Sequence, residues 1–307
     1  MSPSVVANLA VLLVMPFLLP GLINRVKSWW SGRRGPPLFQ PLWDVLRLLR
    51  KQAVYSHTTT PLFRIAPWVL LITSLASVLV TPLLGTKPLV SFAFDFVVLA
   101  YAWGLGRAAV MLAALDTGSS FEGMGAAREA TFSTLVEPAL FLVVGALGLF
   151  SRTQTLHEAL QLKVAGGASA AAWVCAVLCL LVVLQTETAR MPVDDPTTHL
   201  ELTMVHEVMV LDHSGKELAA IQVANGVKLL VGASIIATLL NPWARAGTWV
   251  SGLVTVGLSL VVAMAVGTIE SLIARLKLRA VPQYLGVAIA ASAIALLATT
   301  WRLGGPR

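Results

Sequence analysis

Eight stretches of the sequence are each apolar for about 20 residues, the length that a helix needs to cross the roughly 30 Å hydrocarbon core of a membrane. They lie near residues 3–22, 66–84, 89–112, 131–150, 169–187, 220–240, 248–268 and 281–301. Because backbone polar groups in lipid must be satisfied within their own segment, each stretch is predicted to be helical. The sequence therefore predicts an all-α integral membrane protein, a bundle of about eight transmembrane helices.

The composition excludes the main alternatives. Of the 307 residues, 57% are apolar and only 12% are charged, whereas a soluble domain has about 25% charged residues. A soluble enzyme and a disordered chain are therefore ruled out. The two cysteines, Cys175 and Cys179, are too few for a cluster-binding site. We expect residues 1–307 to form a single integral membrane domain that binds no cofactor, metal or nucleic acid.

The distribution of lysine and arginine predicts the orientation, because positive residues favour the cytoplasmic side. If the N-terminus lies outside, the inner segments are 23–65, 113–130, 188–219 and 269–280. These hold 14 of the 22 positive residues, against six on the outside. Both termini are therefore predicted to lie outside, and the four inner segments to form a cytoplasmic docking face.

The first inner segment is predicted to contain an amphipathic helix that lies at the inner interface. From Pro41 onward, apolar residues recur at helical spacing, with charged residues towards the opposite side. The basic residues could hold anionic lipid, or the segment could be a platform for a cytoplasmic partner. The candidate docking residues are Arg33, Arg34, Gly35, Pro36, Gln40, Arg47, Arg50 and Lys51.

The third inner segment concentrates acids and histidines, which can relay protons because their pKa values can be moved to near neutral. The candidates are Glu187, Asp194, Asp195, His199, Glu201, His206 and Glu207. A network of ion pairs and helix caps is the structural alternative. A metal site is disfavoured, since His199 and His206 lie two helical turns apart.

Four more charged residues lie at membrane depth: Asp95, Arg107, Glu137 and Lys228. Burying such groups costs several kcal/mol even when they are paired, so they are functional candidates by default. We interpret Asp95 and Glu137 as further relay acids, and Arg107 and Lys228 as ion partners. Structural ion pairs between helices remain the alternative.

Two motifs in this order resemble one family of membrane subunits over essentially the whole chain. The first is Gly32-Arg33-Arg34-Gly35-Pro36, followed by Gln40-Pro41 and the run that ends at Lys51. The second is Glu187-x-x-Arg190-x-Pro192-x-Asp194, followed by Glu201-Leu202 and Ser214-Gly215. The family is the H-type subunit of respiratory complex I, with its counterparts in membrane-bound, energy-converting nickel–iron hydrogenases, including formate hydrogenlyase.

This resemblance implies a subunit that joins a cytoplasmic electron-transfer arm to a membrane arm that moves protons or sodium ions. It implies cytoplasmic partners, an iron–sulfur small subunit and a hydrogenase-like large subunit, and antiporter-like partners in the membrane. Iron–sulfur clusters, and in the hydrogenase branch nickel–iron, then belong to partners. The expected location is a bacterial or archaeal cytoplasmic membrane. Glu187, Asp194 and Glu201 match the acids of the family, with Arg190 as their ion partner and Glu137 as its buried acid.

The chain departs from the complex I pattern at Thr197 and His199, and the interval from Glu201 to Ser214 is about three residues longer. These differences favour the hydrogenase branch and argue against quinone binding. The first alternative is a subunit that walls the quinone pocket of an NADH:quinone oxidoreductase. The second is a stand-alone ion transporter, which the absence of internal repeats disfavours.

Overall fold

The computed structural model describes residues 3–85, 87–162, 164, 166–194, 204–244 and 249–304. Within these ranges all regular structure is helical, as predicted. The eleven helices are α1 (Pro3–Trp30), α2 (Gln40–Leu49), α3 (Pro61–Val80), α4 (Asp95–Asp116), α5 (Ser120–Ser151), α6 (Leu156–Leu160), α7 (Ala168–Glu187), α8 (His206–Met209), α9 (Gly215–Leu240), α10 (Trp249–Leu272) and α11 (Val281–Gly304).

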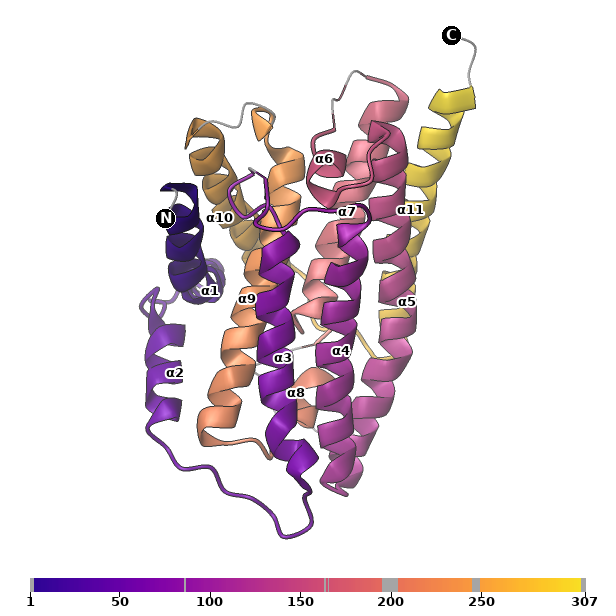
Figure 1. Ribbon diagram of the computed structural model, residues 1–307. Helices are drawn as coiled ribbons and strands as arrows, with labels where there is room; N and C mark the ends of the chain where they lie inside the picture. The colour runs from indigo at the N-terminus through magenta and orange to yellow at the C-terminus, as the bar shows by residue number, and fades with distance from the viewer. Residues whose placement is uncertain are drawn as a thin grey trace.

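Eight of these helices are long and apolar enough to cross a membrane, in agreement with the eight predicted spans. They form an elongated bundle, with α2 near one end and α6 near the other (Figure 1). We call these the α2 end and the α6 end. Helix α9 is the most deeply buried span and packs against α3, α1, α10 and α7.

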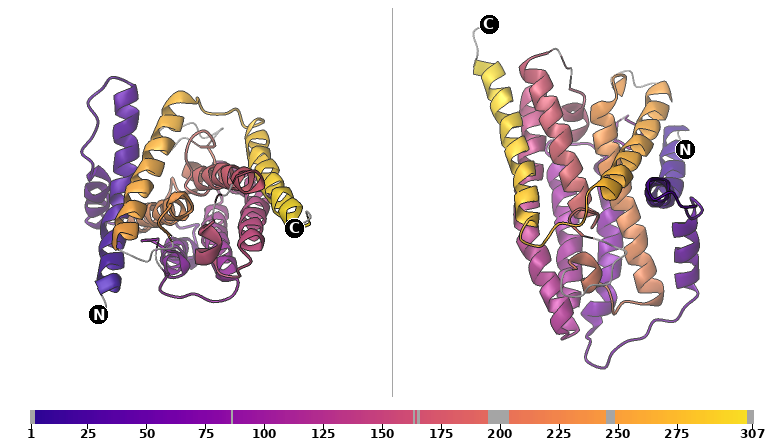
Figure 2. Two further views of the ribbon diagram at one scale, coloured as in Figure 1. Left: turned by 90° about the horizontal axis from the view of Figure 1, so that it is seen from above. Right: turned by 180° about the vertical axis from the view of Figure 1, so that it is seen from behind.

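Helix α1 is steeply tilted against the other long helices. It is seen nearly end-on in Figure 1 and along its length from above in Figure 2. It contacts α9 and α10 and continues to Trp30, eight residues beyond the predicted span. Helix α2 follows as the predicted amphipathic helix, and it begins beside Pro41, since proline is tolerated in the first turn.

The predicted extent of the inner segment 113–130 between two spans is wrong. Helix α4 continues to Asp116 and α5 begins at Ser120, so that only residues 117–119 connect them. At 1.5 Å per residue, the 32 residues of α5 span about 48 Å. This exceeds the hydrocarbon thickness, so the polar first turns of α5 extend the bundle at the α2 end.

Candidate functional site

A group of paired charges lies in the middle of the bundle. Arg107 of α4 contacts Glu137 of α5 at 2.8 Å and Glu187, the last residue of α7, at 3.2 Å. Lys228 of α9 lies 3.5 Å from the other oxygen of Glu187. The side chains of Arg107, Glu187 and Lys228 are buried, whereas that of Glu137 is 45% exposed. Four predicted residues from four helices thus form one cluster, which we call the central cluster.

The central cluster has a fifth member, Glu129, which the sequence analysis missed. Glu129 interacts electrostatically with Arg107, Glu187 and Lys228. It precedes Glu137 by eight residues of α5, about 2.2 helical turns, which places the two acids about 80° apart around the helix. That spacing was visible in the sequence, but the predicted inner segment 113–130 excluded Glu129 from the span.

Asp194 extends the polar groups from the central cluster towards the α2 end. Its Oδ2 accepts hydrogen bonds from the backbone N–H groups of Val205, at 3.2 Å, and His206, at 2.8 Å. Its Oδ1 lies 3.2 Å from the guanidinium of Arg275. Asp194 is 1% exposed, and therefore these contacts replace the water that a buried carboxylate would lose.

His206 lies between Asp194 and the central cluster. Burial and the positive charge of Lys228 lower the pKa of His206 to about 4, against the opposing effects of Asp194 and Glu187. The imidazole is therefore neutral at physiological pH. Its Nε2 lies 3.4 Å from the side-chain nitrogen of Asn225. A neutral imidazole has one donor and one acceptor nitrogen, so it can accept a proton at one nitrogen and release one from the other.

Among the described residues, Arg190 pairs with neither Glu187 nor Asp194, two of its three expected partners. It contacts Glu270 of α10 at 3.5 Å, and Lys27 of α1 contacts the same acid at 3.0 Å. The side chain of Glu270 is fully buried, whereas those of Lys27 and Arg190 are 26% and 13% exposed. Glu187 is paired by Arg107 and Lys228 instead, and Asp194 by Arg275. Glu270 lies 80 residues from Arg190, and Arg275 lies 81 residues from Asp194. Spacing in the sequence therefore could not predict either pair.

Asp95 lies apart from the central cluster. It is the first residue of α4, twelve residues before Arg107, which corresponds to about 18 Å along the helix. Its Oδ1 accepts a hydrogen bond from the backbone N–H of Leu156 at 2.7 Å. The structure therefore assigns Asp95 a structural contact at the α6 end and does not bring it to the other relay candidates.

A cavity of about 370 Å³ opens between α1, α2, α9 and the segment after α7. Three charged residues line it: Asp44 of α2, Arg190, and Glu207 of α8. Asn225, which contacts His206, also lines the cavity. The cavity thus extends from the amphipathic helix α2 to Asn225, and Asn225 contacts His206 beside the central cluster. Asp195, His199 and Glu201 lie outside the described residues.

The predicted docking residues lie along the surface beside this cavity. Arg33, Arg34, Arg47, Arg50 and Lys51 are exposed, whereas Gly35, Pro36 and Gln40 are half-buried. The guanidinium of Arg25 holds the turn by donating to the carbonyl oxygens of Gly35 and Pro36 at 3.4 and 3.3 Å. Gln40 donates to Asp44 at 3.0 Å. Basic side chains are therefore exposed on α2 and on the turn that precedes it.

The fold and the site define a class: a multi-pass helical membrane protein with a buried group of charges that runs from one end to mid-bundle. The chain belongs to the NADH dehydrogenase family, whose model matches residues 4–300. It is 31% identical over 240 residues to hydrogenase-4 component C of Escherichia coli (strain K12), covering 78% of this chain and 75% of the relative. It is 26% identical to formate hydrogenlyase subunit 4 of the same organism, covering 89% and 90%.

A solved structure has the same fold. A chain of the membrane-bound sulfane sulfur reductase, an archaeal respiratory membrane complex, superposes with a TM-score of 0.80 at 17% identity. The match covers 95% of this chain and 98% of that chain.

Proposed function

We propose that the chain is the membrane subunit of a multi-subunit hydrogenase or hydrogenase-related complex, in which it couples electron transfer in cytoplasmic partners to proton or sodium movement. The relatives named as hydrogenase and formate hydrogenlyase components support this proposal. The observation that carries it is the central cluster, because ionisable groups are costly at membrane depth unless they serve transport or binding. The chain itself acts without a redox centre, and iron–sulfur and nickel–iron groups belong to its partners.

The charge balance of the central cluster supports proton transfer. Two cations, Arg107 and Lys228, face three acids, Glu129, Glu137 and Glu187. A buried net charge is expensive in a low-dielectric interior, so one proton shared among the three carboxyl groups brings the cluster to neutrality. That proton is the mobile one. Transport consists of its delivery from the α2 end and its release at the half-exposed Glu137.

The delivery route begins at the cavity beside α2. Asp44, Arg190 and Glu207 place three charged groups in its wall, whereas pockets for organic ligands are mostly apolar with few polar groups. We therefore assign the cavity to water and not to a quinone. From the cavity, Asn225 and neutral His206 lead to Lys228 and Glu187. Asp195, His199 and Glu201 stay candidates for the entrance of this route.

Two surfaces would bind the partners. The basic α2 end suits the iron–sulfur small subunit and the hydrogenase-like large subunit, and it would lie in the cytoplasm with both chain termini outside. At mid-bundle, the carboxylate of Glu137 is 45% exposed, and lipid is a poor solvent for it. An antiporter-like membrane subunit that covers Glu137 would receive the proton there.

Glu187→Gln tests the proposal, because glutamine keeps the shape and hydrogen-bonding capacity of glutamate but removes its charge and titration. The full complex would be reconstituted in liposomes, and electron transfer and ion uptake measured together. We expect ion uptake to fall strongly while the complex still assembles. The matched control is Glu158→Gln at an exposed acid of α6, which should leave uptake unchanged. Normal uptake by both variants would refute the relay.

A further inference from the structure

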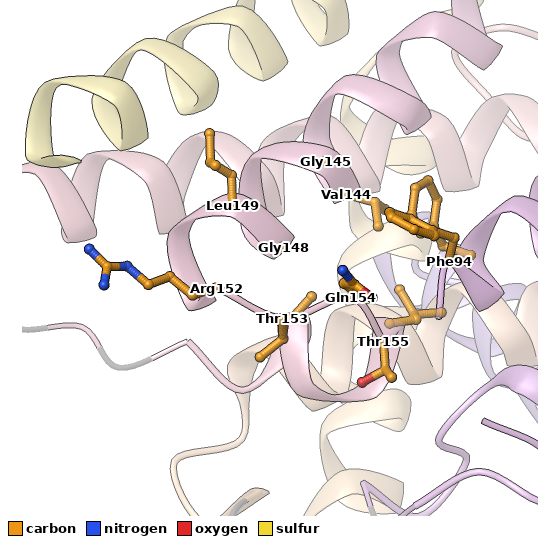
Figure 3. Close-up of a pocket in the computed structure, with 12 residues that line it drawn as sticks. Phe94, Val144, Gly145, Gly148, Leu149, Arg152, Thr153, Gln154 and Thr155 are labelled. Atoms are coloured by element: carbon orange, nitrogen blue, oxygen red, sulfur yellow. The ribbon is translucent and has the colours of Figure 1, made fainter. Parts of the chain in front are cut away.

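A second cavity, of about 470 Å³, lies at the α6 end, away from the central cluster. It is enclosed by the start of α4, the last turns of α5, and the segment that leads into α6. Its volume is in the range of sites that bind small organic ligands. Figure 3 shows Arg152 at one end of the cavity and Phe94 at the other. None of its lining residues contributes to the proposed proton route.

The wall of this cavity is apolar, and the cavity opens outward from the bundle. Phe94 and Phe96 form an aromatic edge, with ring centroids 6.4 Å apart. Phe94 and Leu149 are largely exposed, at 53% and 42%. Aromatic residues are enriched where membrane spans meet the headgroup region. Phe94 and Phe96 lie at the start of α4, and the last turns of α5 line the same cavity. The cavity therefore opens towards lipid near the interface.

The cavity exists because Gly145 contributes no side chain and because hydrogen bonds fix the neighbouring segments. Gly145 lines it, and a Cβ atom at this position would meet no other atom within 4 Å. The backbone N–H of Phe94 donates to the carbonyl of Gln154 at 2.8 Å, and Asp95 accepts from Leu156 at 2.7 Å. These two bonds fix the segment before α6 against the start of α4, so the cavity is a built feature of the fold.

Polar groups gather on the side of the cavity that leads to the aqueous face. Arg152 ends α5 with an exposed side chain, and no acid of the described residues lies within ion-pair distance of it. The hydroxyl oxygens of Thr153 and Thr155 are buried and have no hydrogen-bond partner among the described residues. The cation at the rim complements a ligand with an anionic head.

We propose that this cavity binds one glycerophospholipid from the membrane leaflet at the α6 end. The acyl chain lies along Gly145 and the Phe94–Phe96 edge, and the phosphate lies at Arg152. Arginine suits this role, because a guanidinium binds phosphate with paired, charge-assisted hydrogen bonds.

The test uses the full chain purified in mild detergent together with its associated subunits, and native mass spectrometry counts the bound lipid. We expect one retained phospholipid per chain. Gly145→Leu should abolish its retention, because the new side chain would occupy the cavity without meeting protein atoms. Gly257→Leu is the matched control: it also has open space at its Cβ, but on α10. Equal retention in both variants would overturn the proposal.

Arg152→Gln gives an independent measure, since an exposed side chain can be changed without disturbing packing. After delipidation, added phosphatidylglycerol should bind the variant about tenfold more weakly, the effect of losing one hydrogen bond to a charged group. Lys87→Gln, at an exposed cation near the same end, should leave binding unchanged. Equal protection by inorganic phosphate alone would contradict a lipid site. So would capture of a protein subunit by a photo-crosslinker at Leu149.

Discussion

Glu270→Gln is expected to destabilise the protein strongly, because this acid holds two cations from different elements. Its side chain is fully buried between Lys27 of α1 and Arg190 after α7. Removing one partner of a buried pair costs about 3–5 kcal/mol, since a charge is left uncompensated. Lys27 is 26% exposed and keeps part of its hydration, so we expect a value near the lower limit, about 3 kcal/mol.

Thermal unfolding in detergent measures this effect through the fluorescence of the nine tryptophans. A loss of about 3 kcal/mol should lower Tm by roughly 6–12 °C, or somewhat less for a chain of this length. Glu158→Gln, at an exposed acid, should change Tm by little. A double-mutant cycle adds Lys27→Met, which should cost less in the Glu270→Gln background than in the wild type. Equal Tm values for the two glutamine variants, or additive costs in the cycle, would refute the argument.

Three further outcomes are expected. Glu137→Gln should assemble normally but reduce coupled ion uptake as strongly as Glu187→Gln; full uptake would place the exit elsewhere. Burial lowers the pKa of His213 to about 4, so the folded state holds it neutral while the unfolded state binds a proton near pH 6.5. Stability should therefore be complete above about pH 6.5 and fall by up to about 3 kcal/mol towards pH 4; His213→Phe should reduce this dependence in pH-resolved melting curves. Ser31→Cys should resist labelling by a membrane-impermeant maleimide in intact cells, whereas Lys87→Cys should react; the reverse pattern would invert the orientation.

The sequence predicted the spans correctly because a membrane imposes one simple requirement, about 20 apolar residues per crossing. It predicted the helix ends poorly for the same reason. Hydropathy reports only the part of a helix that lies in lipid, while backbone hydrogen bonding continues beyond it. Helix α1 therefore runs to Trp30, and α5 begins at Ser120 and not near residue 131.

Arg107 and Lys228 were predicted as ion partners, but which acid each cation pairs with could not be predicted, because that depends on how distant helices pack. Arg190 lies next to Asp194 in a compact motif but pairs with Glu270, 80 residues away. Asp95 looked like a relay acid because it is a carboxyl in an apolar stretch. In the structure its oxygen accepts the backbone N–H of Leu156. A charged residue at membrane depth therefore indicates that the residue makes a required contact. Only the three-dimensional structure shows whether that contact is structural or could belong to a relay.

Glu129 shows how much depends on one such residue. With Glu137 and Glu187 alone, the central cluster has two acids for the two cations Arg107 and Lys228, and every charge is matched. Such a cluster would be a structural network with no place for an extra proton. Glu129 adds a third carboxyl group that interacts with Arg107, Glu187 and Lys228, and in the proposed mechanism a bound proton then brings the cluster to neutrality. Glu129, which the sequence analysis placed between two spans, is therefore the residue on which the proposed proton relay, as opposed to a set of ion pairs, depends.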